Sequence, residues 1–408
     1  MTQGQLERLR ARLLRGEALV AGVLSGTSGD GIDVALVRPP PLATPLASPS
    51  AAPQLLGFRT LPFPAAVSGR VRAALDGQAL GLRECALLSR DLGRAFGEAV
   101  REVSRQCGLR PDLVGSHGQT VYHHDSNEPS GPATLQLGDG DFVAEAVGCT
   151  VVSDFRQRDV AAGGEGAPLS ALADDLIFAA LPRPALVLNL GGMANLTFLP
   201  AAPQGELLSF DTGPCNALLD GLARRFLGRP YDAGGEVALA GKPRRELIEG
   251  WLSDPFLRKA PPKSTGRDTF GEPWIDARVE EARALGVLTT GAQPAHLLAS
   301  AAEFVARAAV QGALDFAPAG ARWLVVCGGG VHNARLVAAL AALSPWPVAT
   351  GEDFGVNSDA REALVFATLA ACCVAEVAVT RTTATGARAG RALGKISLPP
   401  LGEGGEHA

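Results

Sequence analysis

The chain has 408 residues, of which 47% are hydrophobic and 19% are charged, and its formal net charge is -5. This length exceeds that of a usual single domain, so we expect two lobes with a large core. The composition argues against extended disorder, and the weak acidic charge offers no basic surface for a nucleic-acid partner.

The seven cysteines are odd in number and form no Cys-x-x-Cys pair, a pattern that fits a reducing compartment. Residues 1–24 read as a charged helical segment before a strand, without a long apolar stretch, and no run of about 18 apolar residues follows. We therefore expect a cytoplasmic protein with no membrane partner.

The first glycine-rich segment is Gly22–Leu36, GVLSGTSGDGIDVAL, in which two apolar, β-branched runs predict a hairpin. Its loop has three glycines, several hydroxyls and free N–H groups, which can hold an anion. A Walker A loop and a dinucleotide fingerprint are both excluded, because each of them runs into a helix. The alternative is a plain Gly/Ser turn.

The next segments predict alternating helices and strands. Residues 38–54 form a Pro/Ala/Ser tract, interpreted as a mobile hairpin insertion, and residues 82–109 have the spacing of an amphipathic helix that ends at a glycine. Strands are expected at residues 112–124, 134–139 and 149–155, before a glycine-rich turn at 161–170 that opens a helix.

A second unit is predicted to begin at Pro184. Residues 184–200 again read as strand, glycine turn and strand, echoing the first hairpin without further sequence similarity. Residues 322–343 read as a strand, a triple glycine and a helix that Asn333 can cap, which favours an anion or nucleotide site. We expect the glycine turns of the two lobes to bind a nucleotide triphosphate from opposite sides.

We therefore expect an α/β protein with the two-lobed actin-like ATPase (ribonuclease H-like) fold and an interlobe cleft for ATP and substrate. The expected first lobe is 1–182 plus 358–408, and the second lobe is 183–357. Two alternative functions share this fold: a phosphatase or polyphosphatase, and a nucleotide-switched binding ATPase.

Seven motifs together resemble, in order and spacing, the anhydro-N-acetylmuramic acid kinase family: GVLSGTSGDGIDVAL, GSHGQTVYH, TLQLGDGDFVAEAVGCTVVSDFRQRDVAAGGEGAPL, LNLGGMANLTFL, FDTGPCNALLD, APPKSTGRDTFG and VVCGGGVHNARL. The resemblance spans Ala21 to Pro399. It implies an enzyme that uses ATP and Mg²⁺ to open the 1,6-anhydro ring of anhydro-N-acetylmuramic acid with water. The O6 atom is phosphorylated, which gives N-acetylmuramic acid 6-phosphate and ADP in peptidoglycan recycling.

The resemblance makes Asp211 the general base, with a helix cap or Asx turn as the alternative role. It assigns ATP to three glycine-rich segments: Gly26, Thr27, Ser28, Gly29, Asp30, Gly31, Ile32 and Asp33; Gly191, Gly192 and Asn195; and Gly328, Gly329, Gly330 and Asn333. Asp30 and Asp33 are the candidates to hold magnesium, directly or through water, although the alternation of the strand lets one of them face solvent.

Six further residues are expected to bind the sugar: His117, Gln119, Thr120, Arg156, Asp159 and Glu362. His117 could instead be a core histidine with its nitrogens satisfied, and Arg156 and Asp159 could instead form an internal ion pair. For Glu362 the alternative is charge compensation at a helix N-terminus.

Three positions depart from the family pattern: Gly29 replaces a leucine, Glu165 a glutamine and Cys215 a glycine. None removes a carboxylate or a phosphate-facing N–H group, so we expect an active enzyme. The resemblance also suggests a homodimer.

Overall fold

The computed structural model describes residues 3–26, 29, 31–42, 51–75, 77–124, 130–202, 205–288, 294–379 and 381–400. The chain divides into two compact units, Met1–Ala180 with Ala360–Ala408 (unit 1) and Leu181–Asp359 (unit 2). Thr27, Ser28 and Asp30 of the first glycine loop lie outside the described residues, as do residues 43–50 of the Pro/Ala/Ser tract.

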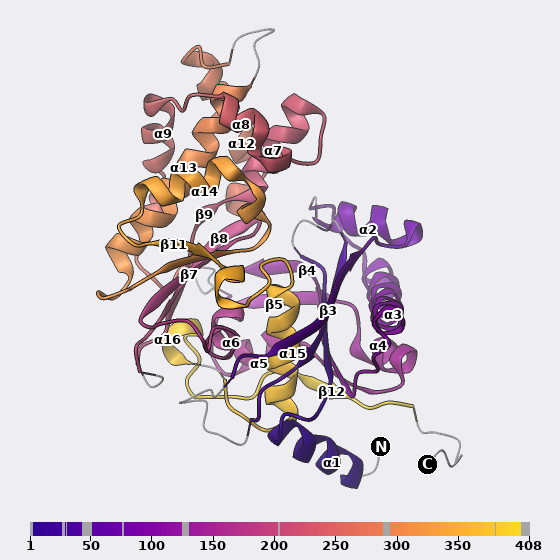
Figure 1. The fold of residues 1–408 in the computed structure, drawn as a ribbon. Coiled ribbons are helices and arrows are strands. Elements are labelled where there is room, and N and C mark those ends of the chain that lie inside the picture. The colour runs from indigo at the N-terminus through magenta and orange to yellow at the C-terminus, as the bar shows by residue number, and fades with distance from the viewer. Residues whose placement is uncertain are drawn as a thin grey trace. The chain divides into compact units, whose positions relative to one another are not determined.

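Unit 1 is built on a mixed sheet with the strand order β12-β6-β4-β1-β2-β3, and β5 pairs with the outer part of β4 (Figure 1). Its described strands are β1 (Val20–Leu24), β2 (Ile32–Arg38), β3 (Gln54–Leu61), β4 (Leu113–His124), β5 (Ala133–Leu137), β6 (Thr150–Ser153) and β12 (Lys395–Ser397). Strand β2 runs antiparallel to both β1 and β3, whereas β4 is parallel to both β1 and β6.

Unit 2 contains a sheet with the order β11-β10-β7-β8-β9. Its described strands are β7 (Ala185–Leu190), β8 (Met193–Leu199), β9 (Leu208–Pro214), β10 (Leu324–Cys327) and β11 (Val348–Thr350). Here β7, β8 and β9 form an antiparallel meander, and β10 is parallel to both β7 and β11.

The two units therefore repeat one topology. Strands β3-β2-β1-β4-β6 of unit 1 and β9-β8-β7-β10-β11 of unit 2 have the same order and the same relative directions. An antiparallel hairpin followed by parallel crossover strands, present twice in one chain, is the duplicated ribonuclease H-like arrangement of actin-like ATPases. This confirms the predicted fold class. The similarity predicted between the two hairpins extends over five strands of each unit.

Helices cover both faces of the unit 1 sheet, with α3 and α4 on one side and α15 on the other (Figure 1). The described helices of this unit are α1 (Gln3–Leu14), α2 (Ala65–Leu75), α3 (Leu82–Cys107), α4 (Gly140–Val147), α5 (Phe155–Ala161), α6 (Ser170–Ile177), α15 (Arg361–Val374) and α16 (Thr382–Thr385). The predicted amphipathic helix is confirmed as α3, which ends at Gly108 in the left-handed conformation.

Unit 2 has a long apolar helix, α13 (Ala295–Phe316), at the centre of its core. The other described helices are α7 (Asn216–Leu227), α8 (Glu236–Ala240), α9 (Arg245–Leu252), α10 (Pro255–Arg258), α11 (Arg267–Phe270), α12 (Glu272–Ala284) and α14 (Ala334–Leu343), with 3₁₀ turns η1 (Ala233–Gly235), η2 (Gly329–His332) and η3 (Gly351–Phe354). Among the described helices, α13 alone is long and apolar enough to cross a membrane, and 78% of its most apolar window is buried inside the protein.

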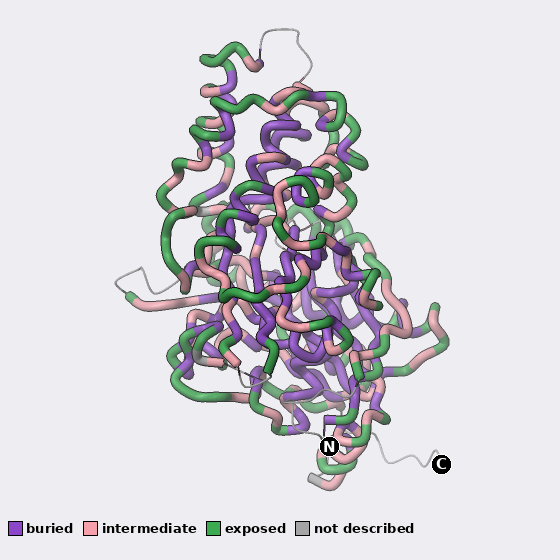
Figure 2. The backbone as a smooth tube through the Cα atoms, turned by 60° about the vertical axis from the view of Figure 1, so that its left-hand side comes forward, coloured by how far each residue is buried: buried purple, intermediate pink, exposed green. Residues whose placement is uncertain are grey.

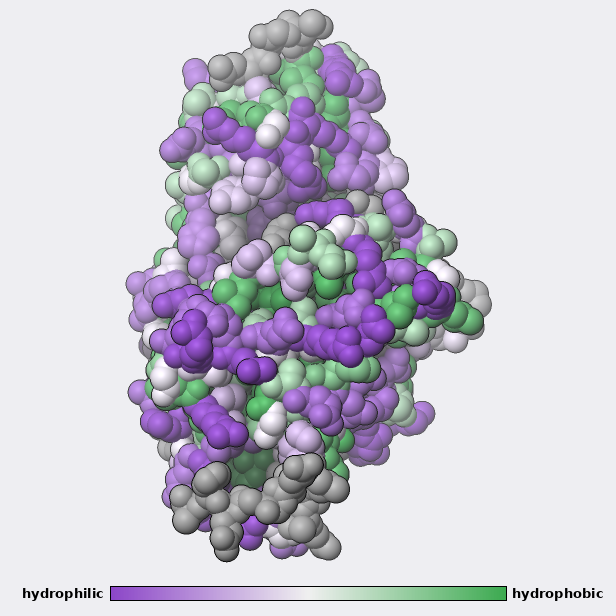
Figure 3. Space-filling view, turned by 90° about the vertical axis from the view of Figure 1, so that its right-hand side faces the viewer, coloured by the Kyte–Doolittle hydropathy of each residue, from purple (hydrophilic) through white to green (hydrophobic). Residues whose placement is uncertain are grey.

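Burial follows this layered arrangement. Figure 2 shows buried backbone inside each unit and exposed segments around it. Figure 3 shows one face of the molecule, on which hydrophobic residues are scattered among hydrophilic ones.

The sheet of unit 1 is packed against the backbone of α15 at glycine positions. A Cβ atom on Gly22 of β1 would lie 1.9 Å from the carbonyl oxygen of Ala363, and one on Gly115 of β4 would lie 2.1 Å from that of Phe366. The absence of side chains at these two positions is therefore what allows α15 to lie directly on the two central parallel strands.

We expect Gly22→Ala to destabilise the protein by about 1–3 kcal/mol, because α15 must move to accept the methyl group. Urea unfolding followed by circular dichroism measures this change. Gly69→Ala in α2 is the matched control, since no atom lies within 4 Å of its added Cβ and alanine favours a helix. Equal unfolding midpoints for the two variants would contradict the proposed packing constraint.

Candidate functional site

In unit 1 the predicted site residues gather where the parallel strands β1 and β4 end. The glycine loop leaves β1 at Ser25, and the Gln119 side chain of β4 donates a hydrogen bond from Nε2 to the Gly26 carbonyl at 3.3 Å. Gln119 is fully buried, and its Oε1 has no hydrogen-bond partner in the part of the chain that the structure describes. Gln119 therefore holds the start of the loop.

His117 is connected to Arg156 in the same region. Its Nδ1 lies 3.1 Å from the Gly118 carbonyl, its Nε2 lies 2.9 Å from Nε of Arg156, and its ring packs against Phe366 with centroids 4.3 Å apart. Burial, and secondly the charge of Arg156, hold the pKa of His117 well below its usual range. A neutral ring that donates from Nδ1 and accepts at Nε2 satisfies both contacts, which favours the alternative of a core histidine.

Asp159 is used inside unit 1. Its side chain is fully buried and accepts hydrogen bonds from the Gly166 N–H at 2.9 Å and the Thr385 hydroxyl at 2.8 Å. Its pKa is raised by burial, and these hydrogen bonds oppose the rise. This arrangement favours an internal role for Asp159, which ties the glycine-rich turn to α16, over direct contact with a sugar.

Arg156, in contrast, is half-buried, and besides contacting His117 it donates from Nη1 to the Gly166 carbonyl at 2.8 Å. Glu362 is also half-buried and lies in the first turn of α15, one helical turn before Phe366. Since residues four apart share a helix face, Glu362 lies on the face of α15 that meets His117.

Two further predicted residues of unit 1 make cross-strand contacts. The Asp33 carboxylate, at the second position of β2, accepts a hydrogen bond from the Thr60 hydroxyl at 2.6 Å. The Thr120 hydroxyl accepts one from Gln136 at 3.2 Å. Gly29 has a φ of +65°, where glycine is favoured over the leucine of the family pattern.

In unit 2 the predicted general base, Asp211, lies on strand β9 opposite Asn195 of β8. Its Oδ2 accepts hydrogen bonds from the Thr265 N–H at 2.8 Å and from the Ser264 hydroxyl at 3.1 Å. Asn195 Oδ1 and Thr265 Oγ1 are buried without hydrogen-bond partners in the described part of the chain. Such atoms are unusual in folded proteins and point to a place where a ligand or water completes the structure.

The three glycines at the end of β10 lie against the end of β7. A Cβ atom on Gly328 would lie 2.7 Å from Asn189 Oδ1, and one on Gly330 would lie 2.6 Å from Leu190 Cβ. A Cβ atom on Gly329 would meet nothing closer than 3.7 Å, and Gly329 is exposed.

The hairpin turn after β7 lies at the same edge of the unit 2 sheet. The Gly191 and Gly192 carbonyls accept hydrogen bonds from the backbone N–H groups that begin α7, which include those of Cys215 and Asn216. The Cys215 side chain is directed into the hydrophobic core of this unit, where it is fully buried.

A 3₁₀ turn separates the triple glycine from the helix that follows it. The 3₁₀ turn η2 follows Gly328, and α14 starts at Ala334. Asn333 caps α14 as predicted, since its Oδ1 accepts from the Leu336 N–H at 3.1 Å. The N–H groups at the triple glycine therefore belong to a short turn, and the Asn333 amide oxygen is committed to the cap.

Residues 263–265 lie inside the motif APPKSTGRDTFG, but the sequence alone predicts no role for them. The structure brings this segment to Asp211 from more than fifty positions along the chain. Its three polar residues, Lys263, Ser264 and Thr265, directly follow two prolines, a pattern that does not identify Asp211 as the partner.

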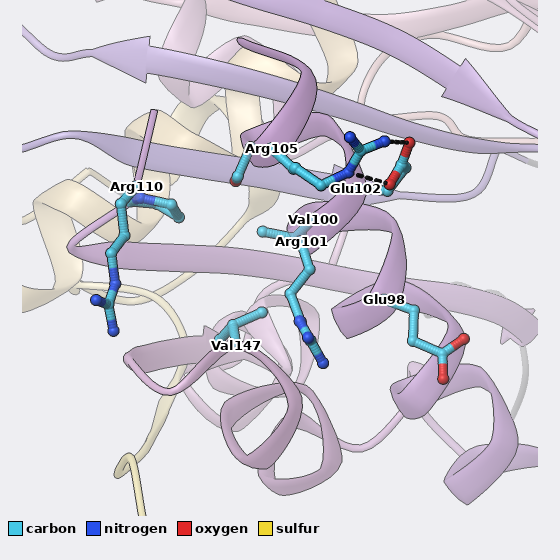
Figure 4. Close-up of a pocket in the computed structure, with 9 residues that line it drawn as sticks. Glu98, Val100, Arg101, Glu102, Arg105, Arg110 and Val147 are labelled. Atoms are coloured by element: carbon cyan, nitrogen blue, oxygen red, sulfur yellow. Dashed lines mark hydrogen bonds and ion pairs between the residues drawn. The ribbon is translucent and has the colours of Figure 1, made fainter. Parts of the chain in front are cut away.

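A pocket of about 500 Å³ lies at the opposite edge of the unit 1 sheet (Figure 4). It is lined by Arg101 and Arg105 of α3 and by Arg110 before β4, together with Glu98 and Glu102. Arg105 pairs with Glu102, so charges of both signs share the opening. This edge carries the amino end of β4, whereas ligands of parallel sheets bind at the carboxyl ends.

The duplicated topology, with glycine turns at the carboxyl ends of the parallel strands β1, β7 and β10, places the protein in the actin-like class of ATPases and sugar kinases. The family model for anhydro-N-acetylmuramic acid kinase matches residues 18–399. The chain belongs to the anhydro-N-acetylmuramic acid kinase family.

Curated relatives carry the same name. The anhydro-N-acetylmuramic acid kinase of Gloeobacter violaceus is 39% identical over 86% of this chain and 91% of its own. That of Bordetella pertussis is 41% identical over 93% of this chain and 95% of its own. Among solved structures, the activator of the 2-hydroxyisocaproyl-CoA dehydratase from Clostridium difficile is similar with a TM-score of 0.43 and 10% identity, over 87% of this chain and 95% of that chain.

These relatives make the protein a kinase, which implies ATP as phosphoryl donor and a small amino sugar as acceptor. The recognition made from the seven sequence motifs is thereby confirmed, and neither alternative function is favoured.

The environment of His117, which lowers its pKa through burial, predicts that the ring stays neutral in the folded protein at pH values where an unfolded histidine becomes protonated. Below the usual histidine value of about 6.5, the unfolded chain binds a proton that the folded chain does not, so stability falls as the pH falls. Nitrogen-detected NMR of the imidazole would follow the ring directly. Denaturant unfolding should show a smaller loss between about pH 7 and pH 5 in His117→Gln than in the wild type. A His117 signal that titrates in that range would contradict the buried contact.

Proposed function

We propose that this protein opens the 1,6-anhydro ring of anhydro-N-acetylmuramic acid with water and phosphorylates O6 with ATP, and that Asp211 is the general base. The observation that carries this proposal is the environment of Asp211, where a carboxylate fixed by two donors stands beside two buried oxygens that have no hydrogen-bond partner among the described residues. Hydrogen bonds to Oδ2 favour the charged carboxylate, the form that accepts a proton.

The chemistry then balances in one sequence of bond changes. Asp211 removes a proton from water as the water oxygen bonds to the anomeric carbon, C1. The bond between C1 and the bridging oxygen breaks, and that oxygen becomes the O6 nucleophile for the γ-phosphorus of ATP. ADP leaves, and the product is N-acetylmuramic acid 6-phosphate. A positioned base contributes typically about 10²- to 10⁴-fold to such a step.

The ATP-binding role belongs to the glycine-rich turns of both units in this proposal. Residues 26–33 follow β1 in a loop whose carbonyl at Gly26 is held by Gln119, and Gly329 is exposed at the end of β10. Backbone N–H groups in such turns bind phosphate oxygens without a side chain. Asn195 beside Asp211 is assigned to the same ligand.

Magnesium fits the donor chemistry next to the first loop. Asp33 carries a partly exposed carboxylate at the start of β2, and Mg²⁺ prefers carboxylate oxygens while it keeps several waters. Asp33 would hold the ion directly or through water, and the bound ion would neutralise charge on the triphosphate. Asp30, the other candidate, lies outside the described residues.

Arg156 and Glu362 are the residues that we assign to the sugar. The guanidinium of Arg156 is held in place by His117 and by the Gly166 carbonyl, which suits it to the lactyl carboxylate of the substrate. Asp159 supports this part of the site indirectly, since it anchors the turn that contains Gly166.

The first test replaces Asp211 with asparagine, which keeps the size of the side chain but removes the proton acceptor. We expect turnover to fall by about 10²-fold or more, with binding of ATP and of the anhydro sugar retained, because only the transition state loses a partner. Turnover is measured by coupled ADP release, and binding is measured by calorimetry.

Reaction in water enriched with heavy oxygen locates the bond that breaks. Promptly analysed product should carry the label on C1 and none in the phosphate, with a control for exchange at C1 through ring opening. Label in the phosphate, or near-normal turnover of Asp211→Asn, would overturn the assignment and favour a phosphatase.

A second prediction concerns Gly329. We expect Gly329→Ala to fold normally, because its Cβ has room, and to weaken ATP binding by roughly 10-fold through a methyl group where a nucleotide approaches. Gly328→Ala is the contrasting variant: its φ of +82° and its contact with Asn189 should lower thermal stability instead. Unchanged ATP affinity in folded Gly329→Ala would place the nucleotide elsewhere.

A further inference from the structure

Lys263 is a buried cation next to the proposed base. Its side chain is only 4% exposed, and Nζ donates to the carbonyls of Leu257 at 3.0 Å and Phe256 at 3.3 Å, at the end of α10. The ammonium group also lies 5.0–5.6 Å from the ring centroids of three phenylalanines, Phe210, Phe256 and Phe316.

Three hydrogen bonds connect the segment 263–265 to Asp211. The Lys263 carbonyl accepts from the Asp211 backbone N–H at 3.1 Å, while the Ser264 hydroxyl and the Thr265 N–H donate to Asp211 Oδ2. The position of Lys263 therefore fixes both donors that orient the carboxylate.

We propose that Lys263 is a positioning residue for Asp211: its buried ammonium group, held by the α10 carbonyls among three aromatic rings, fixes residues 263–265 so that Ser264 and Thr265 orient the carboxylate. This inference rests on the proposed role of Asp211 as the base.

The cost of burying Lys263 supports a role beyond packing. Desolvation of an ammonium group is unfavourable, and an apolar side chain of similar length would fill the space without that cost. Burial lowers the pKa of Lys263 to about 8, whereas the negative charges of Asp211 and Asp315 oppose the drop and the positive charge of Lys259 adds to it. The group is thus mostly charged at neutral pH, where it also favours the ionised form of Asp211.

Lys263→Met tests this role, with Lys242→Met, an exposed lysine of the same unit, as the matched control. We expect Lys263→Met to lower kcat by about 10- to 100-fold, because a misplaced base loses its alignment, with ATP and sugar binding retained. Loss of a cation beside a carboxylate favours the protonated form, so the acid limb of the kcat/KM profile should move to higher pH.

Ser264→Ala keeps the test decisive if Lys263→Met does not fold. It removes one donor from Oδ2 without changing the core, and it should move the same limb upward and lower kcat. Circular dichroism and thermal unfolding establish that each variant is folded. A kcat and an acid limb like those of Lys242→Met in folded Lys263→Met, or in Ser264→Ala where the former is unfolded, would overturn the proposal.

A double-mutant cycle separates this inference from the proposed function. If Lys263 acts through Asp211, adding Lys263→Met to Asp211→Asn should cost little further activity, whereas independent effects would multiply. Multiplying effects would overturn the positioning role and leave the base assignment standing. Near-normal turnover of Asp211→Asn alone would instead overturn the proposed function.

Discussion

The parallel pairing of one strand of each hairpin with the crossover strand is the constraint on which both candidate regions depend. Because β1 and β4 run in the same direction, the glycine loop after β1 and the distal part of β4 reach the same edge of the sheet. Gln119 can then hold the Gly26 carbonyl across 93 positions of sequence. In unit 2 the parallel pair β7 and β10 brings the triple glycine against Asn189 and Leu190. Antiparallel pairing would place these turns at opposite edges.

Local features of the fold could be predicted because their causes are local. The two hairpins follow from alternating apolar residues around glycine turns, α3 follows from its helical spacing, and the Asn333 cap follows from a side chain that reaches a nearby N–H group. The 3₁₀ turn between the triple glycine and this cap was not predicted, because glycine spacing does not distinguish such a turn from a direct helix start.

The partners of the site residues could not be predicted in the same way. The bonds from residues 264 and 265 to Asp211, and the contact of Arg156 with His117, join segments that only the folded sheet brings together. For Asp159 the sequence left a choice between ligand and internal partner. The internal role is favoured by the hydrogen bond from Thr385, which is more than two hundred positions away. Nothing in the sequence marks Thr385 as the partner of a carboxylate.

Two charged groups in the interior of this protein connect separate segments of the chain. Arg361 and Asp174 form a buried pair that ties the start of α15 to α6, and Lys263 ties α10 to the strand that carries Asp211. Such contacts contribute little net stability, since desolvation offsets most of their attraction, but removing one partner leaves a buried charge uncompensated. Their energetic effect is therefore to penalise displaced arrangements. A general base must meet a water molecule at a defined distance, and misalignment of the base reduces the rate directly. A penalty on displacement of Asp211 therefore affects catalysis more than an equal gain in stability of the fold would.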